Sequence, residues 1–262
     1  MTIGPLPGDS PRADCPQITT RRLVHRAAVA WVTLSLVWAS CATAAEVRLA
    51  VAANFRPTMD ALAPVFSALH RHTVQISSAS TGTLHAQIVH GAPFDIFLSA
   101  DAARPQRLDE RGLSHERFTY AIGRLALWIP GSDAPKLADL SQLAGNLAIA
   151  NPATAPYGAA AQHILDISQA PQPMRLIHGN SVSQAFQFVD TGNAEAGLVA
   201  LSLLLARSTP SMEYSEVRGS MHPPLVQQAV RLTDGPHAVE FTRFMQSPTA
   251  RRIIQDHGYR VP

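Results

Sequence analysis

Four short segments of the sequence place small or hydroxyl-bearing residues where a helix is expected to start. They are Ala53-Asn54, Ser80-Thr81-Gly82, Pro156-Tyr157-Gly158 and Asn180-Ser181-Val182-Ser183. Each segment follows a short apolar run, which predicts a junction between a β-strand and an α-helix. The first N–H groups of a helix have no partner within it, and the helix dipole makes this end partially positive. Four such ends brought together would form an anion site.

Neutral donors of this kind can hold a fully ionised oxyanion in a dry cleft without Lys or Arg. The alternative is that each segment is an ordinary helix cap, which stabilises its helix by about 1 kcal/mol and binds nothing. Capping explains each segment taken singly. The hypothesis of an anion site depends on their combination with the family resemblance described below.

The elements that would position these segments follow from hydrophobic periodicity. Short apolar runs alternate with amphipathic stretches, an order that predicts βα units around a parallel sheet. Ligands of such sheets bind at the carboxyl ends of the strands. We expect strands at 47–52, 73–77, 95–98, 125–129, 147–150, 174–178, 196–200 and 226–231. We expect helices at 83–89, 103–111, 159–167, 184–189, 202–206, 236–245 and 248–257, and a further helix that Asn54 caps.

Residues 1–45 have the features of a signal peptide. Arg21, Arg22 and Arg26 precede an apolar run, 27–39, which is followed by small residues up to Ala45. This run is shorter than the roughly 20 residues of a membrane-spanning helix. We therefore expect cleavage near Ala45 and export to the periplasm.

The composition of the chain beyond the signal peptide excludes several classes of function. Four of the 21 basic and two of the 19 acidic residues lie in residues 1–45, so the remainder has no net formal charge. Its single lysine is Lys136, which argues against a nucleic-acid partner. Cys15 and Cys41 both precede Ala45, so no thiolate or disulfide is expected afterwards. Trp38 stands where a lipid-attachment motif has Leu, which argues against a lipid anchor on Cys41.

Several segments carry a family resemblance that covers nearly all of the exported chain. The most specific is Gly91-Ala92-Pro93-Phe94-Asp95-Ile96-Phe97-Leu98-Ser99-Ala100-Asp101. In order along the chain, the others are 52–55, 80–88, 151–152 with 156–158, 182–185, 197–202 and 257–259. Together they strongly resemble the periplasmic molybdate-binding proteins of ABC importers.

The resemblance implies an α/β fold of the type II periplasmic-binding-protein class. In it, two βα lobes are joined by two crossing strands, and the ligand cleft lies between them. We expect lobe 1 at 46–125 and 227–262, and lobe 2 at 126–226. The resemblance also implies a solute-binding protein, not an enzyme, that delivers molybdate or tungstate to a membrane permease. It implies no cofactor, and no metal beyond the molybdenum or tungsten of the oxyanion.

Carried over residue by residue, the resemblance assigns five binding positions. They are Asn54 through its side chain and backbone amide, Ser80 and Thr81 through hydroxyl and amide groups, and Tyr157 and Val182 through their amides. Some members of the family have Ser in place of Asn54 and of Thr81, and some use a tyrosine hydroxyl at the position of Ala200. Molybdate and tungstate have nearly the same radius, so selection by size would exclude the smaller sulfate but would not separate these two.

Competing interpretations of the polar residues are weaker. Asp95 and Asp101 would lie roughly 20 Å apart along an extended strand, too far for a glycosidase pair, and Asp101 is expected to cap a helix. His70 and His72 are expected at a solvated helix end. The histidines His85 and His90 are five residues apart and do not share one helical face, so no metal site is expected.

Two alternatives stay open at this point. One is a binder of sulfate or another oxyanion on the same fold, among which phosphate is disfavoured because no junction supplies an acidic acceptor for its proton. The other is a sensory or enzymatic module on this fold, although the chain has no Gly-x-Ser-x-Gly motif. We expect a monomer.

Overall fold

The computed structural model describes residues 1, 2, 4, 45–168 and 175–262. All helices and strands that it describes lie in the unit Ala44–Pro262. The predicted signal peptide and Cys41 therefore fall outside the described residues, apart from positions 1, 2, 4 and 45. Met174, the expected first residue of one strand, also falls outside them.

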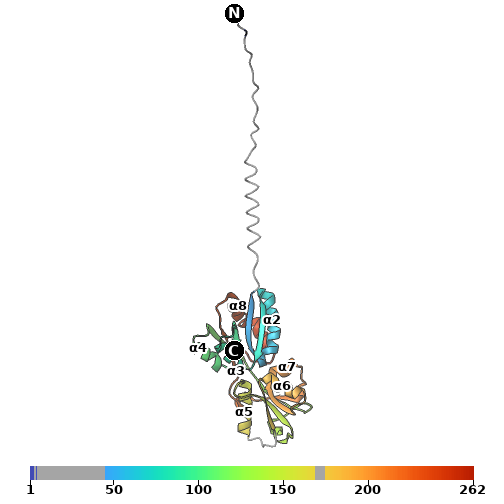
Figure 1. Cartoon of the computed structure of the whole chain (residues 1–262). Helices are drawn as coiled ribbons and strands as arrows, with labels where there is room; N and C mark the ends of the chain where they lie inside the picture. The colour runs from blue at the N-terminus through green and yellow to red at the C-terminus, as the bar shows by residue number, and fades with distance from the viewer. Residues whose placement is uncertain (3, 5–44, 169–174) are drawn as a thin grey trace. The chain divides into compact units, whose positions relative to one another are not determined.

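Lobe 1 is built on a five-stranded sheet in the order β2-β1-β3-β10-β4. Its strands are β1 (Glu46–Ala52), β2 (Thr73–Ala79), β3 (Ile96–Leu98), β4 (Glu116–Ile122) and β10 (Val226–Arg231). Its helices are α2 (Arg56–His70), α3 (Thr81–Val89), α4 (Ala103–Glu110), α8 (Pro236–Met245) and α9 (Pro248–Asp256), preceded by the 3-10 helix η2 (Ala53–Phe55). Figure 1 shows α8, from the C-terminal part of the chain, in the same lobe as α2.

Side chains along the strands of lobe 1 alternate between the two faces of the sheet, and each face packs into a hydrophobic core of its own. Val47, Leu49 and Val51 of β1 pack on one face with α2, α8 and α9. Ala50 points to the other face and packs with Leu84 of α3. Successive side chains of a strand point to opposite faces, so a nearly continuous apolar run is what a sheet covered by helices on both sides requires.

Lobe 2 repeats this plan with a sheet in the order β7-β6-β8-β5-β9. Its strands are β5 (Leu125–Trp128), β6 (Asn146–Ala150), β7 (Arg175–Gly179), β8 (Ala196–Ala200) and β9 (Tyr214–Glu216). Its helices are α5 (Pro156–Ser168), α6 (Val182–Asp190) and α7 (Leu201–Ala206), with 3-10 turns η3 (Leu137–Gln142), η4 (Ser211–Glu213) and η5 (Gly219–Met221). In its core, the Trp128 ring stacks on Phe186 with ring centroids 5.0 Å apart.

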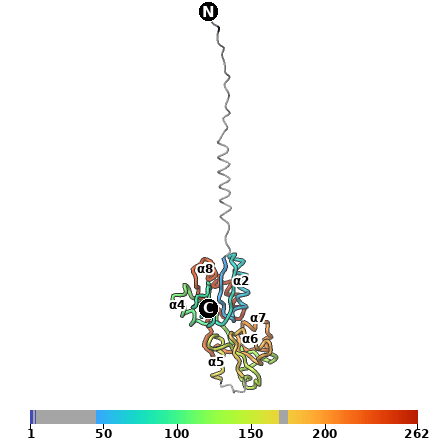
Figure 2. The backbone as a smooth tube through the Cα atoms, in the orientation of Figure 1, coloured from blue at the N-terminus to red at the C-terminus, as the bar shows by residue number. Residues whose placement is uncertain are grey.

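Two connections cross between the lobes, as Figure 2 traces. β4 leads through Gly123 and Arg124 into β5, and residues 217–225 lead from β9 into β10. The βα strands are parallel as expected, whereas the strands that follow the crossings are not: β10 runs antiparallel to β3 and β4, and β5 antiparallel to β8 and β9. A strand that ends at the cleft enters the other sheet from its cleft edge, so it must run against the parallel strands there.

The predicted helix starts are late by two or three residues at the junctions. α3 begins at Thr81 instead of 83, α5 at Pro156 instead of 159, and α6 at Val182 instead of 184. The hydroxyls of Ser80 and Ser181 accept the backbone N–H of the third helical residue, so the small polar residues form the caps and the first turns themselves. Strands β4 and β9 were not predicted; both contain partly exposed residues, which weakens their apolar signal.

One local expectation is wrong, and a second holds only in part. Asn54 does not cap α2; it lies inside η2, and α2 begins after Phe55 with a proline in its first turn. His70 and His72 do lie at the end of α2, but they are not simply solvated, because their ring nitrogens lie 3.5 Å and 3.0 Å from a carboxylate oxygen of Glu240. This end of α2 therefore contacts the Glu240 carboxylate of α8 as well as solvent.

Asp95 ties β1 to β3 and to the segment after β10. Its carboxylate accepts the backbone N–H of Arg48 at 2.8 Å and the hydroxyl of Thr233 at 3.0 Å, and it pairs with the Arg48 guanidinium at 3.4 Å. Burial raises the pKa of this carboxyl group, but the hydrogen bonds from Arg48 and Thr233 outweigh burial and leave the pKa below its usual value. Asp101, in contrast, accepts the backbone N–H of Arg104 at 3.0 Å in the first turn of α4.

We predict that Asp95→Asn lowers the free energy of unfolding by about 1–3 kcal/mol, because a charged acceptor of several buried bonds is lost. The folded-state pKa is depressed, so this stabilisation is present above about pH 4 and is lost as the pH falls through the folded pKa. Urea unfolding at pH 7 and pH 3 should show a smaller difference between variant and parent at pH 3. Asp60→Asn is the control, since Asp60 is half exposed and, within the described part of the chain, pairs only with Arg56 on the helix surface.

Candidate anion-binding site

The five residues assigned from the resemblance line one small cavity. Asn54, Ser80 and Thr81 reach it from lobe 1, and Tyr157 and Val182 from lobe 2. The remaining lining residues are Ala52, Ala53, Ala100, Ala155 and Pro156. The free space, including the mouth, is about 190 Å³. The cavity lies at the carboxyl ends of β1, β2, β6 and β7, where the sheets of both lobes present their strand-to-helix junctions.

Backbone N–H groups at helix starts surround this cavity. Thr81 and Val182 are the first residues of α3 and α6, and Tyr157 is the second residue of α5. These positions have no acceptor four residues earlier within their helices. All three side chains are buried, with exposed fractions of 1–3%. Because no charged side chain is among the described residues that line the cavity, these dipoles are its main source of positive potential.

The hydroxyl of Thr81 is oriented by the backbone of lobe 1. Its oxygen accepts the N–H of Ala100 at 3.1 Å. An oxygen that accepts there leaves the hydroxyl hydrogen free to be donated to another group. The hydroxyl of Ser80 accepts the N–H of Thr83 at 3.4 Å and lies 2.8 Å from the hydroxyl of the same residue. Thr81 therefore has the better defined donor of the two.

The side chain of Asn54 is directed into a buried polar network. Its Nδ2 group donates to Oε1 of Gln227 and to the hydroxyl of Tyr259, both at 3.0 Å. An amide nitrogen carries two hydrogens, so both are engaged. The resemblance assigned the side chain and the backbone amide of Asn54 to the ligand; in this structure both side-chain N–H groups are engaged within the protein.

This network extends behind the cavity and joins the two lobes. The hydroxyl of Tyr259 donates to the backbone oxygen of Asn54 at 2.8 Å, and the hydroxyl of Ser202, on α7, donates to the same oxygen at 3.0 Å. Nε2 of Gln227 donates to the hydroxyl of Tyr157 at 3.2 Å. Gln227 and Ser202 could not be predicted from the sequence, because a single polar residue in an apolar strand or helix gives no periodic signal.

Burial keeps the tyrosines of this network neutral. Tyr120 belongs to the network because its hydroxyl donates to Oε1 of Gln227 at 2.9 Å. Loss of contact with water is the largest cause that raises the pKa of Tyr120, Tyr157 and Tyr259 above the usual value for tyrosine. The three phenols therefore stay protonated at ordinary pH and place no negative charge beside the cavity.

Two glycines permit the close packing around Tyr157. A Cβ atom at Gly158 would lie 2.2 Å from the backbone oxygen of Ala150, so glycine lets the start of α5 approach the end of β6. A Cβ atom at Gly123 would lie 2.3 Å from the hydroxyl of Tyr157 and 2.6 Å from Nε2 of Gln227. The first crossing between the lobes is therefore pressed against the polar network.

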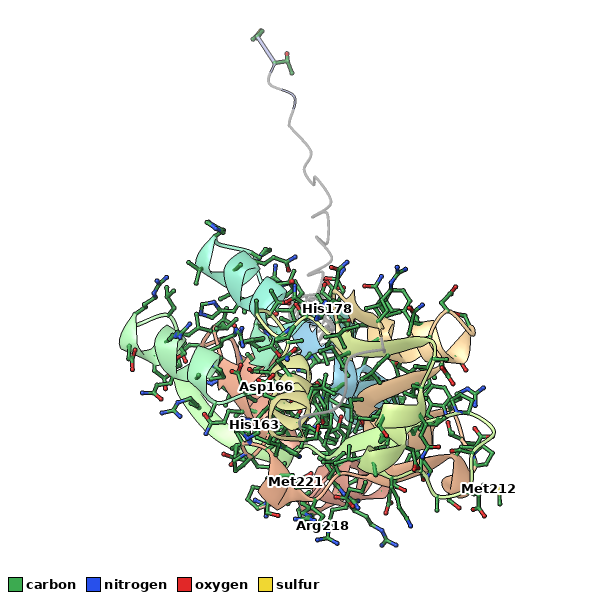
Figure 3. The ribbon with its side chains drawn as sticks, turned by 90° about the horizontal axis from the view of Figure 1, so that it is seen from below. His163, Asp166, His178, Met212, Arg218 and Met221 are labelled. Carbon is green, nitrogen blue, oxygen red and sulfur yellow. The ribbon has the colours of Figure 1, made fainter. Side chains whose placement is uncertain are left out.

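The described part of the chain offers little for metal binding or for crossing a membrane. No group of three His, Cys, Asp or Glu residues is arranged there to hold a metal ion. His163 and Asp166 of α5 and His178 of β7 are seen as separate side chains in Figure 3. Within the same residues, no helix has the length and apolar character needed to cross a bilayer.

Comparison with known proteins places the chain in a family. Bacterial extracellular solute-binding proteins match residues 47–260. The molybdate-binding protein ModA of Azotobacter vinelandii is 42% identical over 234 residues, which are 84% of this chain and 92% of that protein. The molybdate-binding protein of Rhodobacter capsulatus is 37% identical over 244 residues, covering 89% and 96% of the two chains. A solved structure of the periplasmic molybdate-binding protein from Azotobacter vinelandii matches with a TM-score of 0.76 and 35% identity, covering 82% and 99%.

The chain belongs to the bacterial extracellular solute-binding protein family. The type II periplasmic-binding-protein fold expected from the sequence is confirmed, with two α/β lobes joined by two crossing connections. The resemblance to periplasmic molybdate-binding proteins is confirmed as well.

We predict that Tyr259→Phe lowers the free energy of unfolding by about 1–3 kcal/mol, because Nδ2 of Asn54 loses a buried acceptor. Equilibrium unfolding in urea measures the change. Tyr214→Phe is the matched control: Tyr214 is only partly buried, and its hydroxyl has no hydrogen bond to any described residue. Equal stabilities of the two variants would show that the network contributes nothing to folding.

Proposed function

We propose that this protein is the extracytoplasmic solute-binding component of an ABC importer and that it captures molybdate or tungstate. The observation that carries the proposal is the cavity between the lobes, which is lined by helix starts and, among the described residues, by no charged side chain. The proposed ligand contacts are the backbone amides of Asn54, Thr81, Tyr157 and Val182 and the hydroxyls of Thr81 and Ser80. Relatives named as molybdate-binding proteins, 42% and 37% identical, support the choice of anion.

The chemistry of the cavity favours an oxyanion that carries no proton. Hydrogen bonds to a charged group contribute roughly 1.5–3 kcal/mol each, so a few neutral donors can replace the hydration of a dianion. A protonated phosphate needs an acceptor in its pocket, and no carboxylate is among the described lining residues. Phosphate is therefore disfavoured, and sulfate is left to be excluded by its size.

Size would separate sulfate from the larger tetrahedral anions. A smaller sulfate would reach the donors of only one lobe at good distance, and each stretched bond to a charged group forfeits part of its free energy.

The transport role completes the proposal. Residues 1–45 direct export to the periplasm, and lobe 1 (46–125 and 227–262) and lobe 2 (126–226) close on the anion as a monomer. A ligand can favour closure only by binding the closed form more tightly, and donors from both lobes provide that difference. The closed complex then docks on the permease. This role requires no enzyme chemistry, cofactor or nucleic acid; a sulfate binder and a sensory or enzymatic module on this fold are the competing functions.

Calorimetric titration of the anion-free protein with molybdate, tungstate, sulfate and phosphate tests the proposal. We expect one-to-one binding of molybdate and tungstate, with sulfate and phosphate weaker by at least on the order of 100-fold, equivalent to about 2.7 kcal/mol. Tighter binding of sulfate would replace the proposed ligand with the competing anion. Heat from none of the four anions would refute oxyanion capture.

Within this site we predict that Thr81→Val weakens molybdate binding by about 1.5–3 kcal/mol, or on the order of 10- to 150-fold, because a donor to a charged acceptor is lost. The valine side chain preserves the shape of threonine. Thr81→Ser is the matched control, since serine keeps the hydroxyl and should retain most of the affinity. Titration calorimetry on the three proteins measures the effect, and equal affinities would remove the Thr81 hydroxyl from the site.

A further inference from the structure

A second set of contacts joins the lobes at the mouth of the cleft, outside the anion cavity. Nη2 of Arg104, on α4 of lobe 1, donates to the backbone oxygen of Ala153 in lobe 2 at 3.2 Å. The backbone N–H of Gly82, on α3 of lobe 1, donates to the backbone oxygen of Thr154 at 2.8 Å. Two consecutive carbonyl groups of lobe 2 are thus held by two donors of lobe 1.

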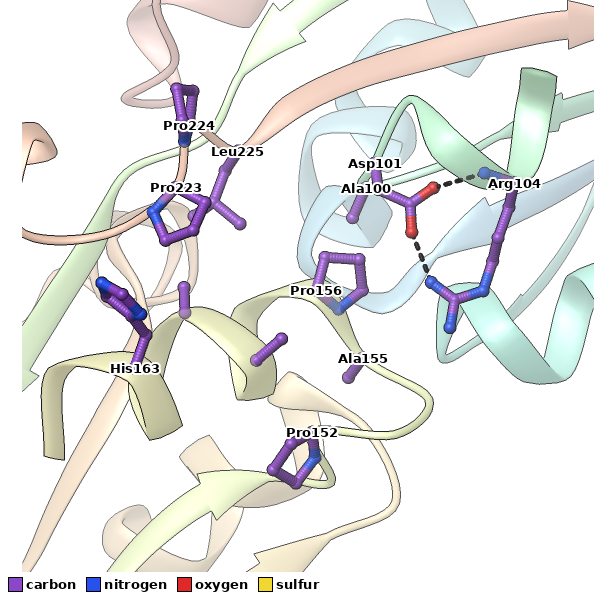
Figure 4. Close-up of a pocket in the computed structure, with 12 residues that line it drawn as sticks. Ala100, Asp101, Arg104, Pro152, Ala155, Pro156, His163, Pro223, Pro224 and Leu225 are labelled. Atoms are coloured by element: carbon purple, nitrogen blue, oxygen red, sulfur yellow. Dashed lines mark hydrogen bonds and ion pairs between the residues drawn. The ribbon is translucent and has the colours of Figure 1, made fainter. Parts of the chain in front are cut away.

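Arg104 is fixed in place before it reaches across the cleft. Its Nη1 group pairs with the carboxylate of Asp101, as the dashed line in Figure 4 marks. The same carboxylate accepts the hydroxyl of Ser99 at 3.1 Å and the backbone N–H of Arg104 at 3.0 Å. The side chains of Arg104 and Asp101 are only 19% and 20% exposed. A side chain that is already ordered loses little entropy when it makes a further bond.

The carbonyl groups that receive these bonds belong to the loop that positions Tyr157. The loop follows β6, and Oδ1 of Asn151 accepts the backbone N–H of Ala153 at 3.0 Å. It continues directly into α5, whose second residue is Tyr157. A Cβ atom at Gly82 would lie 2.9 Å from the backbone oxygen of Thr154, so the approach of this loop to α3 requires glycine at that position.

The contacts also lie on a cavity that adjoins the anion cavity. Figure 4 shows this outer cavity, where Asp101 and Arg104 face the loop with Pro152 and the start of α5. Its volume is about 310 Å³, and it shares Ala100, Ala155 and Pro156 with the anion cavity. The guanidinium group of Arg104 is neutralised by its partner carboxylate, so its main contribution here is a directed donor and not an attracting charge.

We propose that Arg104, anchored by Asp101, is a positioning residue that latches the closed form and sets the residence time of the anion. This inference rests on the proposed capture of an oxyanion between the lobes. The bond to Ala153 joins the two lobes, so it stabilises the closed form and not the open one, and a contact of that kind changes the rate of release. Arginine suits the role because its planar fork can bond Asp101 and Ala153 together, whereas a lysine ammonium cannot present that geometry.

The test compares Arg104→Gln and Arg104→Lys with Arg107→Gln, a control on the same helix at an exposed arginine for which no side-chain bond is found among the described residues. Stopped-flow experiments measure association and release of molybdate. We expect both Arg104 variants to release the anion about 5- to 20-fold faster, with association nearly unchanged, and the Arg107 variant to behave as the parent. A release rate unchanged in Arg104→Gln would overturn the latch. The latch would also be overturned if association slowed in Arg104→Gln, recovered in Arg104→Lys and no longer differed from the parent at high salt. Arg104 would then act by its charge.

Hydrogen exchange of the Gly82 amide provides a second measurement that needs no ligand. We expect this amide to exchange faster in Arg104→Gln than in the parent and in Arg107→Gln, because the neighbouring bond to Thr154 opens more often. Equal exchange in all three proteins would contradict the latch even if the protein binds molybdate. Failure of the parent to bind any oxyanion would instead contradict the proposed function, and the exchange result would still decide whether Arg104 latches the lobes.

Discussion

Backbone N–H groups that have no partner in their own helix are the constraint on which this structure depends. Thr81 and Val182 bring such groups from different lobes to one buried cavity. A buried donor left unsatisfied costs about 1–3 kcal/mol, so an acceptor between the lobes stabilises the closed form further. An anion removes this penalty for several donors at once. Under the proposed function, capture and closure would be a single event that needs no charged side chain to drive it.

The polar network behind the cavity determines how rigidly those donors are held. Asn54 is bonded to Gln227 and Tyr259, residues far along the chain, and its backbone oxygen accepts hydroxyls of Tyr259 and Ser202. All of these groups are buried and neutral. The phenol of Tyr259 stays protonated because burial raises its pKa. A satisfied buried network is stiff and adds no charge of its own. The wall of the cavity therefore resists the inward movement that a smaller anion would require.

The sequence predicted much of this architecture, since apolar runs and helix stripes report burial directly. It placed Ser80, Thr81, Tyr157 and Val182 at junctions that do converge, because the carboxyl ends of parallel strands share one edge of each sheet. It did not predict β4, whose residues are partly exposed, nor the antiparallel direction of β10, which follows from the crossing between lobes. The partners of Asn54 were equally out of reach, because contacts across long separations leave no local pattern.

Under the proposed function, selection between anions and retention of the bound anion depend on different parts of the cleft. Donors in the cavity would touch the anion, so their spacing decides which anion is bound well. Arg104 and Gly82 bond to backbone oxygens of lobe 2 and not to cavity-lining groups. Such contacts stabilise the closed form equally for every anion that allows full closure, and equal stabilisation cannot change a ratio of affinities. Selectivity must therefore reside in the stiff, neutral wall of the cavity, whereas contacts at the mouth can lengthen residence without altering which anion is chosen.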